Sequence, residues 1–84
     1  MITITIKNDS IKAVGHAEYR SYGNDIVCSA VSCLLQTLEL RGKATKSSGN
    51  MIVQTEDKEA LKLISEGLKQ IAENYPLNVE VLNE

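Results

Sequence analysis

The first seven residues carry the pattern that most limits how this chain can fold. Ile2, Ile4 and Ile6 alternate with threonine or lysine, and this period of two with β-branched residues predicts a half-buried strand. A strand of this kind requires partner strands and an apolar layer over its buried face. The rest of the chain must supply both.

Further strand patterns follow at regular intervals. A turn at Asn8 and Asp9 leads into a second strand expected over 10–17, which pairs with the first as a hairpin and carries His16 near its end. Residues 43–55 resemble a second hairpin with its turn at 47–50. Leu77, Val79 and Val81 are expected to form a fifth strand at the end of the chain.

Two helices are predicted between these strands. Asn24 or Asp25 is expected to cap the first, which is mostly buried and stops before Gly42. The second has one apolar stripe and is closed by Pro76; the stripe consists of Leu61, Ile64, Leu68, Ile71 and Tyr75. The order ββαββαβ predicts a single α+β domain over 1–84, in which one mixed β-sheet is covered by two helices as an α/β sandwich.

Composition excludes some partners. The 84 residues include 9 Lys plus Arg against 11 Asp plus Glu, and the basic residues are scattered, so the chain lacks the concentrated positive face that nucleic acid requires. The N-terminus has no signal-peptide pattern, and no apolar run approaches the roughly 18 residues of a membrane span. We therefore expect a soluble cytoplasmic protein, in which the two cysteines do not form a structural disulfide.

Cys28 and His16 carry the chemistry of interest. With either predicted cap, Cys28 lies in the first helical turn, where free backbone N–H groups and the positive end of the helix dipole favour a thiolate. His16 ends the strand that leads into the same loop. A cysteine–histidine pair supports acyl transfer, because the imidazolium stabilises the thiolate and later protonates the leaving amine. Helix-start N–H groups could receive the oxyanion.

The neighbouring residues each have two interpretations. Asp25 either caps the helix only or also orients His16. Ser32, one turn after Cys28, either packs locally or faces the site. Cys33 is assigned to the core rather than to chemistry, because five residues turn a helix by about 140° and separate the two Cα atoms by about 8.7 Å, too far for a disulfide. One histidine and two cysteines fall short of a zinc site, so we expect no metal or organic cofactor.

The stretch from 18 to 24 is expected to be an exposed loop. Tyr19 and Tyr22 are either surface residues or the walls of a peptide pocket, and Gly23 supplies a backbone conformation that other residues avoid. A loop flanked by Gly15 and Gly23 is suited to close over a substrate. The rival interpretation is a non-catalytic α+β module that binds a peptide or a dimer partner. A redox-sensing thiol would need a resolving cysteine within reach.

The sequence GHAEYRSYGNDIVCSAVS, residues 15–32, resembles the signature G-H-A-x5-G-x-D-I-V-C-[AS]-A-V-S of the ribosomal-processing cysteine protease family, called Prp. The resemblance implies that Cys28 is the nucleophile, that His16 is the general acid/base, and that Asp25 is a candidate orienting residue. It also implies that the intervening loop covers the substrate peptide.

The same resemblance implies a biological setting. Members of the family are bacterial, cytoplasmic homodimers with an α/β sandwich fold, and they remove an N-terminal extension from large-subunit ribosomal protein twenty-seven. Members are usually longer than this chain, and the difference falls within 40–59. A related phage structural protein is the alternative substrate.

Overall fold

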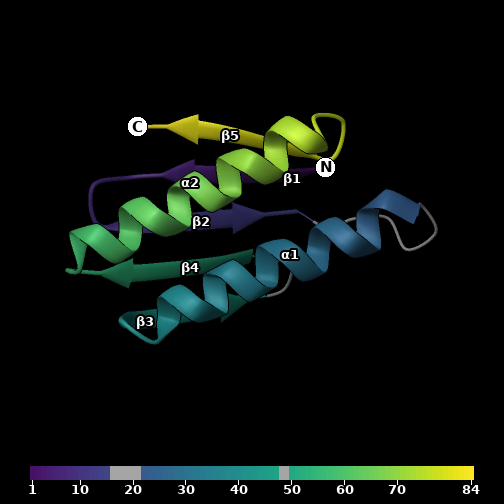
Figure 1. The fold of residues 1–84 in the computed structure, drawn as a ribbon. Coiled ribbons are helices and arrows are strands. Elements are labelled where there is room, and N and C mark those ends of the chain that lie inside the picture. The colour runs from purple at the N-terminus through teal and green to yellow at the C-terminus, as the bar shows by residue number, and fades with distance from the viewer. Residues whose placement is uncertain (16–21, 48–49) are drawn as a thin grey trace.

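The computed structural model describes residues 1–15, 22–47 and 50–84, with the backbone alone for 22–25. Seven elements follow in the predicted order ββαββαβ (Figure 1): β1 (Ile2–Ile6), β2 (Ser10–Val14), α1 (Tyr22–Glu39), β3 (Gly42–Ser47), β4 (Asn50–Thr55), α2 (Lys58–Asn74) and β5 (Val79–Asn83). One five-stranded sheet has the order β3-β4-β2-β1-β5.

The sheet is mixed, as predicted. β1 pairs antiparallel with β2 and parallel with β5, while β4 pairs antiparallel with both β2 and β3. Both expected hairpins are therefore confirmed, but the expected extent of the second strand is wrong, because β2 ends at Val14 and Gly15 lies outside it. The register aligns Ile4 with Ala13 and Ala13 with Met51, so these side chains lie in one row on the same face of the sheet.

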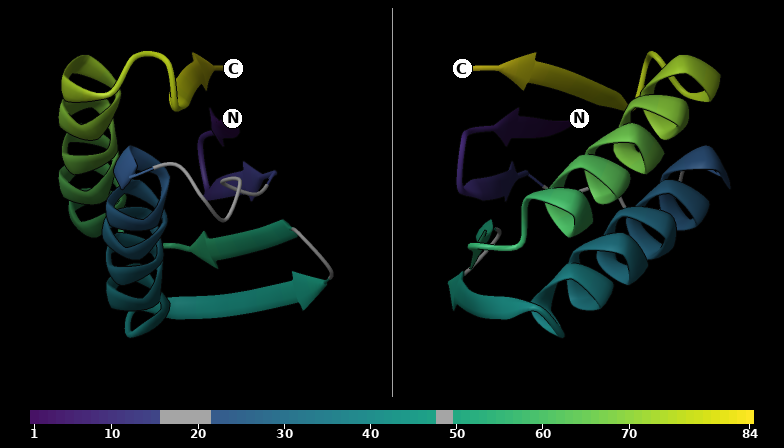
Figure 2. Two further views of the ribbon diagram at one scale, coloured as in Figure 1. Left: turned by 90° about the vertical axis from the view of Figure 1, so that its right-hand side faces the viewer. Right: turned by 60° about the vertical axis from the view of Figure 1, so that its left-hand side comes forward.

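Both helices lie on that same face and pack against each other, which completes the predicted sandwich (Figure 2). The core forms where the apolar stripes of the helices meet the isoleucine face of β1 and its neighbours; its largest fully buried side chains are Ile4, Ile11, Leu35, Leu38, Leu68, Val27 and Val53. This arrangement supplies the apolar cover that the alternation in β1 requires.

The expectation that α1 is mostly buried is wrong. Val27, Val31, Leu35 and Leu38 form its buried stripe, but Ile26 is 44% exposed, and further exposed residues follow on the outer side: Ser29, Ser32, Cys33, Gln36 and Thr37. A helix that covers one face of a sheet buries only the side chains that recur every three or four residues along that face.

The second helix has the predicted stripe and a well-defined start. Leu61, Ile64 and Leu68 are buried, and Asp57 is the N-cap, whose Oδ1 accepts a 3.0 Å hydrogen bond from the amide of Ala60. The prediction that Leu77 belongs to the last strand is wrong. It lies in the turn that links α2 to β5, is 87% exposed, and precedes the first strand residue by two positions.

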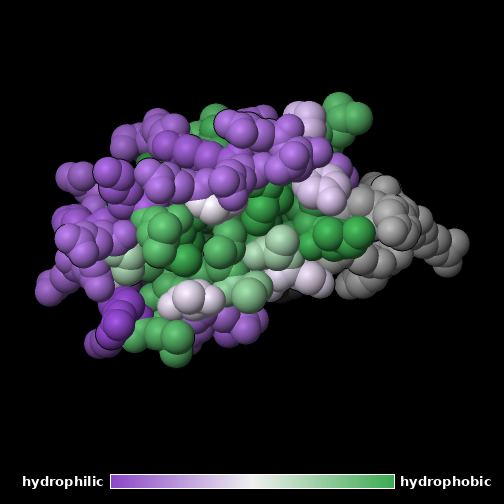
Figure 3. Space-filling view, viewed as in Figure 1, coloured by the Kyte–Doolittle hydropathy of each residue, from purple (hydrophilic) through white to green (hydrophobic). Residues whose placement is uncertain are grey.

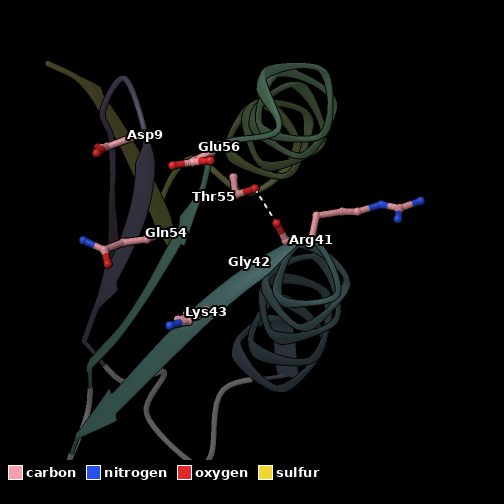
Figure 4. A pocket seen from close by; sticks show the side chains of 7 residues that line it. All are labelled: Asp9, Arg41, Gly42, Lys43, Gln54, Thr55 and Glu56. Atoms are coloured by element: carbon pink, nitrogen blue, oxygen red, sulfur yellow. Dashed lines mark hydrogen bonds between the residues drawn. The ribbon is translucent and has the colours of Figure 1, made fainter.

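One buried hydroxyl ties together three elements at the far end of β4. Thr55 Oγ1 donates a 2.6 Å hydrogen bond to the carbonyl of Arg41 and accepts one of 3.0 Å from the amide of Asp57, as Figure 4 shows for the first of these bonds. Gly42 lets the strands meet there, because a Cβ at this position would lie 1.9 Å from the carbonyl oxygen of Gln54. The end of α1, the end of β4 and the start of α2 are thus held together.

Candidate active site

Cys28 lines a groove of about 330 Å³ between α1 and the ends of the central strands. The helix contributes one face over three turns, and the sheet contributes the start of β1, the end of β2 and the tip of the β3–β4 hairpin. The lining residues are Ile2, Ala13, Gly15, Cys28, Val31, Ser32, Leu35, Gln36, Lys46, Ser47, Asn50 and Met51. Cys28, which is half-buried, therefore borders this open space.

The groove has an apolar floor and a polar rim. Val31 and Leu35 are buried members of the core, and Met51 packs against that core. Ser32 and Gln36 on α1 face Ser47 and Asn50 of the hairpin across the same space, and all four are exposed. This combination suits an extended peptide, whose apolar side chains can pack against the floor while its backbone forms hydrogen bonds with the rim.

Gly15 shapes the end of the groove next to the predicted histidine. Its φ of +111° lies in the region that favours glycine, and a Cβ at this position would lie 2.4 Å from the carbonyl oxygen of Met1. The chain thus leaves β2 in a direction that another residue would not take without strain. This is the residue directly before His16.

The predicted start of the first helix is wrong, and with it the position of Cys28 in the first turn. α1 begins at Tyr22, so Tyr22 and Gly23 belong to the helix rather than to a loop, and Asn24 and Asp25 lie within its first turn rather than at its cap. Polar and acidic residues are favourable in the first turn as well as at the cap. The residue types of Asn24 and Asp25 therefore did not show which of these two positions they occupy.

Cys28 is therefore the seventh residue of α1. The effect of the helix dipole falls off within the first turn, and the free N–H groups belong to the first four residues. The backbone amides at the helix start therefore do not by themselves account for an activated thiolate at Cys28.

The assignment of Cys33 to the core is also wrong. It is exposed on the outer side of α1, whereas Cys28 is half-buried on the inner side, and both are free thiols. The two residues are rotated by about 140° from each other around the helix axis. Cys33 therefore points to the side of α1 that no described element covers. The conclusion that Cys33 lies away from the site is unaffected.

Not every predicted site residue can be placed. His16 and Tyr19 lie outside the described residues, and only the backbone of Tyr22, Gly23 and Asp25 is described. Of the two interpretations of Ser32, the position beside the groove is the one observed, since Ser32 lines the groove with Cys28. In the described part of the chain, no three His, Cys, Asp or Glu side chains come together as metal ligands would. Within that part, no helix is both long and apolar enough to span a membrane.

Sequence reasoning missed the hairpin side of the groove, which Lys46, Asn50 and Met51 provide. These residues follow Cys28 by about twenty positions and carry no motif. The only signal that could have found them is topological: β4 is antiparallel to β2, so the hairpin tip lies at the same end of the sheet as the end of β2.

Solved structures with this fold include two of an essential ribosomal processing protease Prp from S. aureus. One, in complex with a covalently linked product peptide, matches with a TM-score of 0.83 at 23% identity, and the match covers 100% of both chains. The other, in complex with a substrate peptide, matches with a TM-score of 0.85 at 22% identity, again over 100% of both chains. These likenesses establish the fold.

A third structure, of a Streptococcus mutans protein, has a TM-score of 0.69 at 25% identity and covers 99% of this chain and 93% of that one. A search among curated proteins found no match. The family model described as cysteine protease Prp, however, matches residues 1–80, which confirms the resemblance of residues 15–32. The chain belongs to the Prp family of cysteine proteases.

Proposed function

We propose that this protein is a ribosomal-protein processing protease in which Cys28 and His16 form the catalytic pair. The observation that carries the proposal is the position of Cys28, the cysteine of the family signature, in a groove with an apolar floor and a polar rim. The S. aureus protein of the same fold is a ribosomal processing protease, with one structure in complex with a covalently linked product peptide and one in complex with a substrate peptide.

The reaction follows from these two residues. The Cys28 thiolate attacks the carbonyl carbon of the scissile bond, and His16 protonates the amine that leaves as the C–N bond breaks. Water, deprotonated by His16, then attacks the thioester and releases the acid. Gly15 supports this assignment, because it lines the groove with a positive φ and is the residue directly before His16.

Other residues are assigned supporting roles in this proposal. Asp25 lies one turn before Cys28 in α1 and is proposed to orient His16. Tyr19, Tyr22 and Gly23 are proposed to contact the substrate from the segment that precedes Cys28, and Ser32 from the rim. The chemistry requires no metal or organic cofactor, and residues 1–84 are proposed to form one protease domain.

The proposed substrate is the N-terminal extension of large-subunit ribosomal protein twenty-seven, with a related phage structural protein as the alternative. Both would be met in the bacterial cytoplasm, which is the compartment that we propose for this protein. Two free thiols among the described residues are compatible with such a reducing compartment.

Mass spectrometry of cleavage products tests the proposal. The purified protein is incubated with the extended ribosomal protein and, separately, with the phage protein. We expect one new N-terminus that is produced by the native protein and by Cys33→Ala, but not by Cys28→Ala or His16→Ala. Binding of either protein without cleavage would favour a non-catalytic binding module, and loss of cleavage in Cys33→Ala alone would refute the assignment of Cys28.

A homodimer is also proposed, and an exposed apolar area on the helical layer supports it. Leu40 and Leu63 are 81% and 68% exposed, and they border a cavity of about 350 Å³ with Leu38, Ala60 and Ile64. Figure 3 shows apolar side chains gathered over α1 and α2 on this face. Sedimentation analysis should give twice the chain mass for the native protein and the single-chain mass for Leu63→Glu.

A further inference from the structure

We propose that Lys46 is a specificity-determining residue that selects an acidic side chain in the substrate peptide. The inference rests on the proposed protease function and concerns the same groove. Among the described residues that line the groove, Lys46 is the one with a charged side chain. Within that described lining, a carboxylate on a bound peptide would therefore meet the ammonium of Lys46.

Strand geometry directs Lys46 towards the groove. It lies opposite Met51 in the β3–β4 register, and cross-strand partners project to the same face of a sheet. Met51 packs against the core under α1 and lines the groove. Lys46 therefore projects from the edge strand β3 to the side of the sheet on which α1 and Cys28 lie.

The ammonium of Lys46 already has a carboxylate partner that a substrate can replace. Its Nζ lies 3.8 Å from Oε1 of Glu39 near the end of α1, and the two side chains are 58% and 40% exposed. An ion pair this open to water contributes little to stability. A substrate carboxylate can therefore take the place of Glu39 at little cost to the fold.

The length of the helix sets where the acidic residue falls in the peptide. Glu39 follows Cys28 by eleven positions in α1, which is about 16 Å along the helix axis at 1.5 Å per residue. Lys46 also lines the groove that holds Cys28, so its side chain is available to a peptide bound there. An extended peptide advances about 3.3 Å per residue, so the acidic side chain should lie three to five residues from the bond that is cleaved.

Lys43 provides a matched control on the same strand. It lies opposite Gln54. Because Lys43 and Lys46 are three positions apart on one strand, their side chains project to opposite faces of the sheet. Figure 4 shows Lys43 at a different cavity, which it lines together with Asp9, Gln54 and Glu56. Lys43→Glu changes the net charge and the composition of β3 as much as Lys46→Glu does. It leaves the lining of the groove unchanged, because Lys43 does not line the groove.

The test is a cleavage-site profile on peptides from a chymotrypsin-digested bacterial proteome, which keep internal acidic and basic residues, read by mass spectrometry, for the native protein, Lys46→Glu, Lys43→Glu and Cys28→Ala. The native protein and Lys43→Glu should prefer Asp or Glu at one position, three to five residues from the cleaved bond. The preference should be about fivefold, the factor that corresponds to an ion pair of about 1 kcal/mol. Lys46→Glu should lose the acidic preference and prefer Lys or Arg there.

The outcomes separate the two proposals. Cleavage that depends on Cys28 but shows no acidic preference, or a preference that Lys46→Glu leaves unchanged, overturns the role of Lys46 and leaves the protease function intact. A preference lost equally in Lys43→Glu also overturns it, because net charge would then be the cause. Absence of any Cys28-dependent cleavage overturns the proposed protease function, and the role of Lys46 with it.

Discussion

Cys28 and Cys33 lie on opposite sides of α1: Cys28 is half-buried and lines the groove, whereas Cys33 is exposed on the outer side of the helix. If access alone governed reactivity, Cys33 would react first with an alkylating reagent. A catalytic thiolate reverses this order, since the thiolate is the reactive form of cysteine. The reaction rates of the two thiols can therefore be compared within one protein sample.

We predict that iodoacetamide at neutral pH modifies Cys28 faster than Cys33, by about tenfold or more, because the proposed base His16 would supply thiolate at Cys28 only. Peptide mass spectrometry over a time course measures both rates in one sample. His16→Ala should slow the reaction of Cys28 and leave that of Cys33 unchanged. A faster reaction at Cys33 in the native protein would show that exposure decides and that Cys28 is not activated.

Gly15→Ala should destabilise the protein and reduce cleavage. The added Cβ would lie 2.4 Å from the carbonyl oxygen of Met1, at a φ of +111°, and strain of this kind costs about 1–3 kcal/mol. Gly67→Ala is the control, because its nearest neighbour is the flexible end of Leu34 at 3.1 Å and alanine favours the helix. Urea unfolding measures both; equal stability of the two variants would contradict the strain at Gly15.

Thr55→Val should lower the free energy of unfolding by about 1–3 kcal/mol, because it leaves the carbonyl of Arg41 and the amide of Asp57 without their shared partner. Thr55 is 5% exposed, so water cannot readily replace the hydroxyl. Thr55→Ser keeps both hydrogen bonds and should lose less. A valine variant as stable as the native protein in urea would show that these bonds contribute nothing.

Asp57→Ala should cost about 1 kcal/mol, the usual cost of losing an N-cap. Its Oδ1 accepts from the amide of Ala60 at the start of α2. Asp57→Asn retains an oxygen acceptor and should stay close to the native protein. Thermal unfolding followed by circular dichroism distinguishes them, and a similar loss in both variants would mean that the charge, rather than the cap, stabilises the helix.

Much of the fold could be predicted because the short-range patterns are strong. The alternation in β1 and the stripe of α2 report directly which side of each element is buried, and the turn residues at 8–9 and 47–50 separate the strands of each hairpin. These features need only neighbouring residues. The start of α1 was predicted wrongly, because Asn24 and Asp25 suit the first turn as well as the cap.

Local spacing along the chain is sufficient to predict the element order, the apolar faces and the family signature around Cys28. The pairing of β4 with β2 is visible only in the folded protein, and it brings Lys46 and Met51 of the hairpin to the groove of Cys28. The exposure of Cys33 is likewise visible only in the folded protein. The sequence of a helix indicates its apolar stripe, but not which of its other sides remains uncovered. Pairing between distant strands depends on how the layers pack together, and no short stretch of residues encodes that.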